Sequence, residues 1–206
     1  MLSGTALFLQ NLGRLQEALA LREAIVRRDP VNVTLLFSLG NVQRLTGQFD
    51  AAIASYRSAL SLSPGGGMAH YYICEAMLLK GDAPAALAEI EQEKSEVWRL
   101  IGMPMAYHAL GRKTESDDAL ATLLAKNEKC GPYNISYVYA FRGDADKAFE
   151  WLDKAVQYAD PGLIDIAVEN LFDKIHSDPR WLPFLRIIGR APEQLAKIEF
   201  KVPPLQ

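Results

Sequence analysis

The sequence has few of the residues on which many protein classes depend. Only two of its 206 residues are cysteine, Cys74 and Cys130, and only three are histidine. Two cysteines are too few for the disulfide framework of a small secreted protein, and neither belongs to a CxxC pair of the kind that binds zinc. The three histidines leave few candidates for a catalytic base.

Long basic runs and long apolar runs are also absent. Lys and Arg number 22 against 25 Asp and Glu, the net charge is −3, and no basic run exceeds Arg27–Arg28. A nucleic-acid surface needs clustered cations that displace counterions from phosphates, so we expect no nucleic-acid partner. No stretch approaches the roughly 18 apolar residues of a membrane span, and the N-terminus has no basic leader. We expect a cytoplasmic protein, or a periplasmic one if a membrane segment precedes it.

What the sequence does contain is a regular spacing of glycine. Gly13, Gly47 and Gly81 are each 34 residues apart, and Gly111 and Gly143 continue the series at shorter intervals. Five residues after each of these glycines the chain has a small residue, namely Ala18, Ala52, Ala86, Ser116 and Ala148. Several positions that agree in one register indicate a repeat architecture.

Each repeated position has a mechanical reason in a pair of antiparallel helices. Glycine permits the left-handed backbone of a tight turn between two helices, and the small residue lies where the second helix crosses the first. Pro30 and Pro64, again 34 residues apart, end the second helix because proline cannot continue its hydrogen bonds. Apolar residues between these positions step at helical spacing, as in Phe49, Ala52, Ile53, Tyr56, Ala59 and Leu60.

The second unit resembles a tetratricopeptide repeat, with matching residues at Leu39, Gly40, Gly47, Ala52, Tyr56, Ala59 and Pro64. Other units depart at single positions: Arg22 replaces the usual aromatic residue, and Glu93 replaces a small one. The resemblance implies an all-α fold, a right-handed α-α superhelix of stacked helix pairs. We assign about five repeats to residues 1–160, with approximate bounds 1–30, 31–64, 65–96, 97–128 and 129–160.

Residues 161–206 break the period, and we assign them to a divergent C-terminal helical cap with an extended tail. Asp178 and Pro179 are expected to start a helix, which then carries Trp181, Phe184, Leu185 and Ile188 on one face. A repeat array needs such an atypical end unit to cover its last apolar face. Residues 200–206 are expected to lie extended on the surface.

The C-terminal half also resembles the tetratricopeptide region of bacterial multi-domain signalling proteins, in which a nucleotide cyclase or a winged-helix regulator precedes the repeats. This resemblance is carried by residues 134–155, 160–162 and 177–181. No signalling module is visible in the chain itself. Aligning Gly13 with Gly47 places Met1 inside the first helix of a repeat, so we expect the repeat arm of a larger protein.

The sequence carries no motif for catalysis or cofactor binding. His70 and Cys74 share a helix face, but no second pair completes a metal site, so we assign them to core packing. Asp173 and His176 could pair, yet no nucleophile motif accompanies them. The three glycines at 65–67 lack the strand and the Lys-Ser/Thr of a phosphate-binding loop. We expect no catalytic residue, metal or cofactor; an enzyme would need a deep pocket that holds His108 beside an acidic residue.

The concave face of such a superhelix is lined by the first helix of each pair. Projecting every unit onto the second gives candidate groove residues for protein or peptide binding: Phe37, Asn41, Arg44, Tyr71, Tyr72, Glu75, Met105, His108, Tyr133, Asn134 and Tyr137. Tyrosine beside Asn and Arg gives stiff contact area with a polar end, which is typical of protein-binding surfaces. One subset of the family grips C-terminal carboxylates with Lys, Arg and Asn, but at the aligned positions only Asn41 matches, so we do not expect that ligand.

Two functions follow from these expectations. The first is a non-catalytic protein–protein interaction module that binds a peptide or partner domain in the concave groove. The alternative is an oligomerisation or regulatory arm of a larger bacterial signalling protein, with a homo-oligomer formed through the exposed N-terminal repeat.

Overall fold

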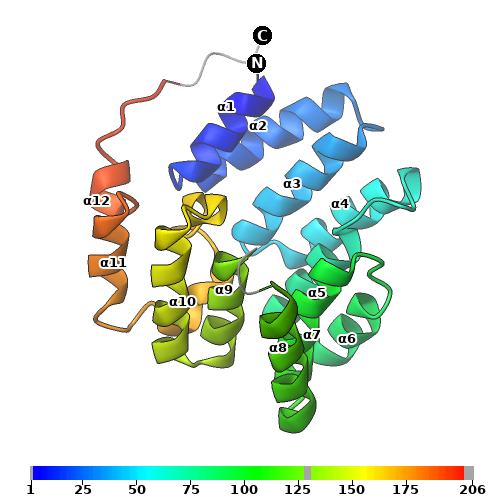
Figure 1. Ribbon diagram of the computed structural model, residues 1–206. Coiled ribbons are helices and arrows are strands. Elements are labelled where there is room, and N and C mark those ends of the chain that lie inside the picture. Colours follow the sequence, from blue (N-terminus) through cyan, green and yellow to red (C-terminus); the bar gives the residue numbers. More distant parts are fainter. Residues whose placement is uncertain (1, 128–130, 202–206) are drawn as a thin grey trace.

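The protein is an all-α stack of helix pairs (Figure 1). The computed structural model describes residues 2–127 and 131–201, and these ranges contain no strand. Five successive pairs form the array: α1 (Leu2–Asn11) with α2 (Leu15–Arg28), α3 (Val33–Leu45) with α4 (Phe49–Leu62), α5 (Ala69–Lys80) with α6 (Ala83–Ile90), α7 (Glu96–Ala109) with α8 (Lys113–Asn127), and α9 (Pro132–Arg142) with α10 (Ala145–Gln157). None of the described helices is long and apolar enough to span a membrane. Cys130 and residues 202–206 of the expected tail lie outside the described residues.

Every pair is joined by the same tight turn. A positive φ between +71° and +92° occurs at Gly13, Gly47, Gly81, Gly111 and Gly143, in the left-handed region that glycine adopts without strain. In each turn the N–H after the glycine donates to the carbonyl five residues earlier, as from Gln48 to Gln43 at 2.8 Å. This is the Schellman C-cap, and it confirms the turns predicted from the glycine spacing.

The predicted small residues lie at the helix crossings. No surface is exposed on the side chains of Ala18, Ala52, Ala86, Ser116 and Ala148. Gly40 serves the same close approach from the first helix, because a Cβ there would lie 2.6 Å from the Tyr56 ring. A larger residue would therefore push α3 away from α4. Pro30 and Pro64 each follow the end of the second helix by two residues, as expected.

The third pair differs from the expected repeat at its second helix. The sequence pattern places Glu93 inside that helix at a small-residue position, but α6 ends at Ile90. Glu93 is buried, and its carboxylate accepts hydrogen bonds from the backbone N–H of Tyr71 (3.2 Å) and of Ser95 (2.9 Å). A carboxylate forced into a helix crossing would be buried without partners. Because α6 ends at Ile90, Glu93 lies outside the helix and caps the first turn of α5 instead.

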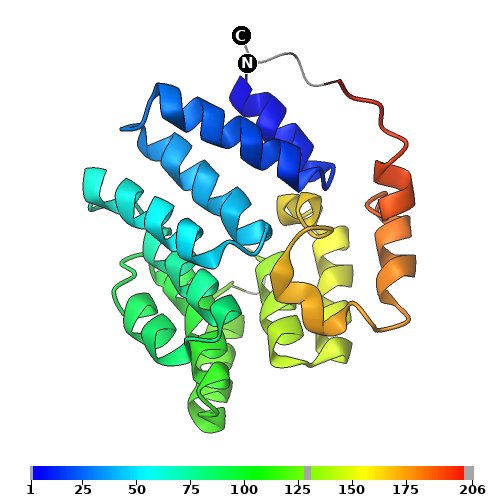
Figure 2. The same ribbon diagram turned by 180° about the vertical axis from the view of Figure 1, so that it is seen from behind.

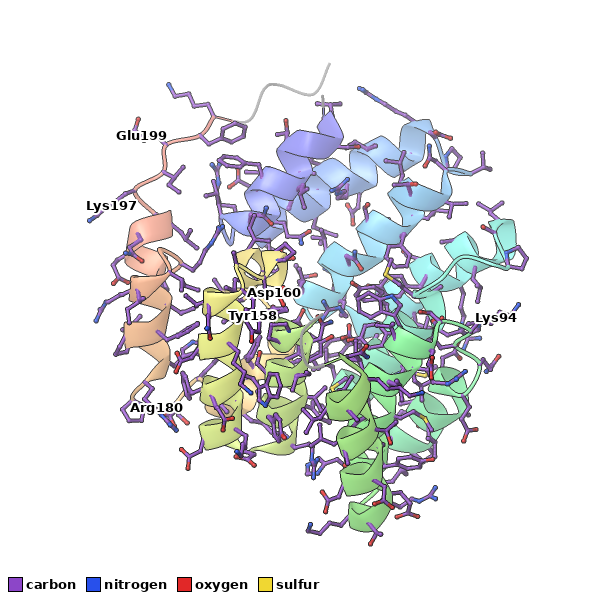
Figure 3. All side chains as sticks on the ribbon, in the orientation of Figure 1. Lys94, Tyr158, Asp160, Arg180, Lys197 and Glu199 are labelled. Carbon is purple, nitrogen blue, oxygen red and sulfur yellow. The ribbon has the colours of Figure 1, made fainter. Side chains whose placement is uncertain are left out.

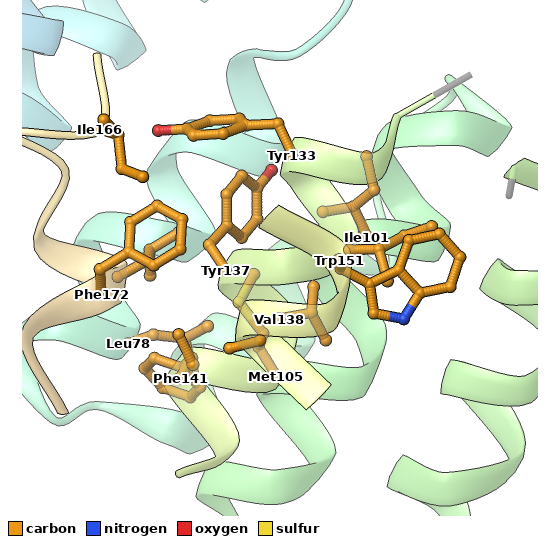
Figure 4. Packing of buried hydrophobic residues seen from close by; sticks show 14 of the residues in the cluster. Leu78, Ile101, Met105, Tyr133, Tyr137, Val138, Phe141, Trp151, Ile166 and Phe172 are labelled. Carbon is orange, nitrogen blue, oxygen red and sulfur yellow. The ribbon is translucent and has the colours of Figure 1, made fainter. Parts of the chain in front are cut away.

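The buried apolar residues form two clusters. The smaller core joins α1, α2 and α3 through Ala6, Leu9, Ala18, Leu19, Leu21, Ile25, Leu39 and Val42. The larger core extends from α4 to the residues after α11, and it is rich in aromatic side chains. Figure 4 shows part of it, where Tyr133 and Tyr137 of α9 lie beside Phe172 and Ile166.

The C-terminal region begins with two 3-10 helices, η1 (Pro161–Ile164) and η2 (Asn170–Ile175), followed by α11 (Trp181–Ile187) and α12 (Pro192–Leu195). Trp181, Phe184 and Leu185 are buried, as expected for a capping helix, whereas Ile188 follows the end of α11 and is only partly buried. Gly189, with φ +74°, forms a sixth turn of the same type between α11 and α12. The cap is therefore a shortened and divergent helix pair.

This region does more than cover the last repeat. Figure 2 shows η2 lying across α9, and Figure 1 shows α11 and α12 beside α10, after which the chain runs back toward α1. The Phe200 ring packs edge-on against Phe8 with 4.9 Å between centroids, and Arg14 donates to the Phe200 carbonyl at 2.6 Å. The first described residue of the expected surface tail is thus anchored on α1, because Phe200 shields part of an apolar face that α1 leaves open.

Candidate functional site

The first helices of the pairs face a common cavity of about 310 Å³. We call it the inner cavity. Of the groove residues predicted from the sequence, the structure brings eight together in its wall: Asn41, Arg44, Tyr71, Tyr72, Glu75, Tyr133, Asn134 and Tyr137. They come from α3, α5 and α9 because the repeat turns the same face of each first helix inward.

Three predicted groove residues lie elsewhere. Met105 is fully buried in the larger core. Phe37 packs against the rings of Tyr56 and Tyr72 and lines a separate apolar pocket of about 210 Å³. His108 lies at an outer hollow near the turns of the fourth and fifth pairs. Met105 and His108 precede the turn glycine Gly111 by the same intervals by which Asn41 and Arg44 precede Gly47. Equivalence in the repeat therefore does not bring these two residues of α7 to the cavity.

Eight further residues of the cavity wall were missed by sequence reasoning: Gln10, Leu45, Trp98, Asp160, Pro161, Gly162, Asp165 and Glu169. Trp98 is on α7, a first helix, and an aromatic residue on such a helix was a usable signal. The residues after α10 gave no signal, because the cap does not follow the repeat register. Asp160 follows the end of α10 (Figure 3) and accepts a hydrogen bond from the backbone N–H of Tyr133 at 3.1 Å. The cap therefore closes one side of a groove that the repeat pattern predicts to be open.

A buried ion pair joins the array to the cap across the inner cavity. Arg44 donates from both terminal nitrogens to Glu169, at 2.7 and 2.8 Å, and both side chains are buried. Burial opposes ionisation of Glu169, but the Arg44 charge and hydrogen bonds outweigh it and lower the pKa of the Glu169 carboxyl. This bidentate geometry is the strongest form of a carboxylate–guanidinium contact.

Glu75 is a second buried carboxylate beside the same guanidinium. Its Oε2 lies 3.6 Å from Arg44 Nε, and only 2% of the residue is exposed. Burial raises the pKa of Glu75 to about 7, while Arg44 opposes the shift and Glu169 adds to it. The Arg44 guanidinium thus keeps Glu169 ionised, while the pKa of Glu75 stays near neutral pH.

A chain of hydrogen bonds runs from α9 to this carboxylate. Asn134 Nδ2 donates to the Tyr137 hydroxyl at 2.7 Å, and the hydroxyls of Tyr137 and Tyr71 lie 2.6 Å apart. Tyr71 in turn donates to Glu75 Oε1. Because each hydroxyl has one proton, Tyr137 donates to Tyr71. Burial raises the pKa of both tyrosines, which keeps these hydroxyls neutral.

Some buried atoms of the wall have no hydrogen-bond partner in the described part of the chain. They are Arg44 Nε, Glu75 Oε2 and the Tyr133 hydroxyl. Asn41 accepts from the Tyr56 hydroxyl at 2.8 Å, while Asn41, Tyr72, Trp98 and Asn134 are only partly buried. The inner cavity therefore offers aromatic surface, unsatisfied polar atoms and a partly exposed rim, which suits a small polar group inserted from outside.

A larger outer hollow of about 1040 Å³ has a different character. Its wall includes His108 beside Asp117, the combination that an enzyme would require. Asp117, however, is paired with Lys113 at 2.5 Å and also with Arg142. Arg180, labelled in Figure 3, is part of the same wall and pairs with Asp146 at 2.8 Å. These charges pair with one another on an open surface, and burial lowers the pKa of His108.

The other candidate catalytic or metal-binding groups are placed as follows. Cys74 is buried, as expected, but His70 is only partly buried, and its Nδ1 lies 2.7 Å from Glu89 Oε1 rather than in the core. His176 and Asp173 lie 3.6 Å apart on the surface, and the His176 ring packs on Trp181. Within residues 2–127 and 131–201, no group of three His, Cys, Asp or Glu side chains could hold a metal ion.

Comparison with known proteins identifies the repeat. A family model of the tetratricopeptide repeat matches residues 5–67 and 46–95, and a second model of the same description matches residues 133–160. Together these matches cover more than half of the chain. Neither match includes α7 and α8, although that pair has the same turn at Gly111. No curated protein matches the sequence.

Solved structures share the fold at low sequence identity. A tetratricopeptide repeat protein from Parabacteroides merdae is 17% identical, with a TM-score of 0.58 over 94% of this chain and 77% of that one. MamA is 19% identical, with a TM-score of 0.50 over 71% of this chain and 90% of that one. YrrB, a repeat protein with an unusual peptide-binding site, is 20% identical with a TM-score of 0.49 over 80% of this chain and 88% of that one.

Proposed function

Because this chain belongs to the tetratricopeptide-repeat family, whose members generally mediate protein–protein interaction, we propose that it is a non-catalytic module that binds a peptide segment of a partner protein at the inner cavity. The observation that carries this proposal is the convergence of α3, α5, α7 and α9 on one cavity with a partly exposed rim. Asn41, Tyr72, Trp98 and Asn134 form that rim and offer both ring faces and amide groups.

The size of the inner cavity indicates what kind of partner segment would enter it. Its volume of about 310 Å³ is at the lower end of the range of ligand pockets. Such a space admits one or two side chains and excludes a folded domain. A peptide would therefore rest its backbone against the rim amides and insert a side chain between the tyrosines, with η1 and the segment between η1 and η2 closing the far wall.

A synthetic random peptide library, displayed on phage and selected on the immobilised protein, tests the proposal. Selected peptides should bind the purified chain in solution, and Trp98→Ala should lower their affinity at least tenfold because it removes a ring from the rim. The matched control is Tyr107→Ala. Tyr107 lies on the same helix, is also partly buried and stacks on Arg112, but it is not part of the cavity wall.

The control separates loss of the site from loss of the fold. The melting temperatures of Trp98→Ala and Tyr107→Ala, measured by circular dichroism, should lie within a few degrees of each other. Selected peptides that bind equally well to both variants would place the binding surface outside the inner cavity.

A second candidate function is self-association through the N-terminal repeat, as an oligomerisation or regulatory arm of a larger signalling protein. The observation in its favour is the apolar surface at that end of the array, where Leu7 is 48% exposed and Phe8 is 40% exposed. Sedimentation equilibrium tests it: a dimer that dissociates on Leu7→Glu would support this function. A monomer at every concentration would remove it.

A further inference from the structure

The charges that line the inner cavity are unbalanced. Among its described residues a single guanidinium, Arg44, faces four carboxylates: Glu75, Asp160, Asp165 and Glu169. Arg44 is already engaged by Glu169 through two hydrogen bonds. Glu75 is thus a carboxylate buried beside a cation that another carboxylate has neutralised. A positively charged guest would lower the cost of ionising it.

No donor of the described wall lies within hydrogen-bond distance of the second Glu75 oxygen. Glu75 Oε2 has no hydrogen-bond partner in the described residues, and Arg44 Nε at 3.6 Å is too distant to provide one. The Tyr133 hydroxyl is likewise buried and unpartnered within the same ranges. Buried polar atoms are normally hydrogen-bonded, and an ionised carboxylate only accepts. The missing partner of an ionised Glu75 Oε2 is therefore a donor group, whereas Arg44 Nε needs an acceptor and the Tyr133 hydroxyl can take either.

Aromatic rings make up much of the remaining wall. Tyr71 packs against Trp98 with 5.0 Å between ring centroids, and against Tyr72 with 5.2 Å. The faces of such rings carry negative electrostatic potential and attract organic cations. Burial raises the pKa of Tyr71 and Tyr72, so neither hydroxyl contributes a charge of its own. Rings combined with carboxylates suit an alkylammonium group better than an anion or a bare apolar side chain.

We propose that the inner cavity binds the ammonium group of a lysine side chain presented by the partner peptide. This inference rests on the proposed function, because it names the side chain that the peptide inserts. The methylene stem lies against the Tyr71 and Trp98 rings, and the ammonium donates to Glu75 Oε2. Lysine is favoured over arginine because Arg44 already occupies one side of a small cavity, and an ammonium is more compact than a guanidinium.

The first test uses n-butylammonium, which reproduces the lysine stem and charge without a peptide. The chain has three tryptophans, whose indole N–H signals are resolved by NMR. Trp98 lines the inner cavity, while Trp151 and Trp181 belong to the larger core and act as internal controls. n-Butylammonium should shift the Trp98 signal saturably in the millimolar range and leave the other two in place. n-Butanol and n-butyrate should bind at least tenfold more weakly.

Two substitutions locate the ammonium. Glu75→Gln keeps the shape and should lower the affinity for n-butylammonium at least tenfold. Asp165→Asn, at a partly buried carboxylate of the same wall, should lower it by a smaller factor and serves if Glu75→Gln alters the fold. Glu193→Gln removes the same charge from exposed α12, where Glu193 pairs with Arg186, and should leave the affinity unchanged.

The affinity should also depend on pH. Because the pKa of Glu75 is about 7, affinity for n-butylammonium should rise between about pH 6 and about pH 8, and Glu75→Gln should abolish the rise. The amine itself stays charged over this interval. The charged or titratable groups that interact with Glu75 are Arg44 of α3, Tyr56 of α4, Tyr71, Tyr72 and Cys74 of α5, Tyr137 of α9 and Glu169 of the cap.

The peptide arm separates this inference from the proposed function. In a library-selected peptide, replacing the critical lysine by norleucine should lower affinity at least tenfold. If selected peptides bind at the rim without any dependence on lysine, the inference fails and the peptide-binding function stands. If n-butylammonium binds but no peptide is selected, the lysine inference and the peptide-binding function both fail, and the cavity would instead be a site for a small free amine. Equal shifts of all three tryptophans, or tighter binding of n-butyrate, would also overturn the ammonium site.

Discussion

The small core of α1 to α3 and the large core from α4 onward are built on the same repeat, yet they differ in content. The small core consists of Ala, Leu, Ile and Val side chains only. The large core contains Tyr56, Tyr71, Tyr133, Tyr137, Phe141, Phe149, Trp151, Phe172, Trp181 and Phe184. Aromatic side chains bury the largest areas, and in a repeat array each unit is stabilised by itself and its neighbours only. The first helix pair is therefore the less stable end.

The two cores are linked by polar contacts and by the end of the chain. Arg44, on the helix that follows the first pair, binds Glu169 of the cap, and Gln10 of α1 donates to Asp165 at 3.4 Å. Phe200 packs on Phe8. The cap thus returns to the weaker end and ties it to the stronger one across the inner cavity.

The largest effect is expected at the centre of the large core. Phe172 is fully buried between Tyr133, Tyr137 and Trp181, with ring centroids 5.5 to 6.3 Å away. Phe172→Ala should lower the free energy of unfolding by about 4 kcal/mol, through lost burial and the remaining void. Urea unfolding measures it. A loss below about 1 kcal/mol would show that η2 is not an integral part of this core.

The next largest effect is expected where the two ends meet. Glu169→Gln removes the hydrogen-bonded counter-ion of the buried Arg44 charge, leaves only Glu75 at 3.6 Å, and should cost about 3 kcal/mol at neutral pH. The pKa of Glu169 is lowered in the folded state, so its contribution is present above the unfolded pKa and disappears as pH falls through the folded one. Stability of the variant and the parent should therefore converge in acid, as urea titrations at several pH values would reveal.

A similar truncation in the small core should have a local effect. Leu9 is fully buried on α1, and Leu9→Ala should cost about 2–3 kcal/mol. The expected loss of amide hydrogen-exchange protection is confined to α1 and α2, while α9 and α10 keep theirs. Uniform loss of protection over all helices would show that the two cores unfold as one, and that the first helix pair is not a less stable end.

The smallest expected effect has the opposite sign. The pKa of Glu75 rises from an ordinary 4.5 to about 7 on folding, so the folded state binds a proton that the unfolded state has released. The contribution of Glu75 to stability therefore falls as pH rises from about 4.5 to about 7. Glu75→Gln should flatten this slope and stabilise the chain above pH 7 by about 2 kcal/mol. The melting temperatures of Glu75→Gln and Glu169→Gln, each measured relative to the parent protein as pH rises, should change in opposite directions.

The repeat itself could be predicted residue by residue. The five glycines, the small residues after them and the two prolines each report one local requirement: a positive φ, a close helix crossing or a helix end. These requirements act over a few residues, so a single sequence expresses them. Projection along the repeat likewise brought Arg44, Glu75 and Tyr137 to one cavity, because residues at equivalent positions share a face.

The other half of the inner cavity could not be found in this way. Glu169, Asp165 and Gly162 lie in a segment that has no repeat, and their partners are far away in the chain. A Cβ on Gly162 would lie 2.3 Å from the Tyr133 ring, which shows how closely the cap approaches α9. The early end of α6 escaped prediction for the same reason, since Glu93 bonds to the start of a different helix.

The sequence by itself determined that this protein is a stack of helix pairs with a fixed inner face, because turns, crossings and helix ends depend on neighbouring residues. The tertiary structure alone decided that the chain closes its own groove, and that one guanidinium serves two buried carboxylates there. Those outcomes depend on burial and on charges brought together from distant parts of the chain. Neither burial nor such proximity is encoded in the spacing of the repeat.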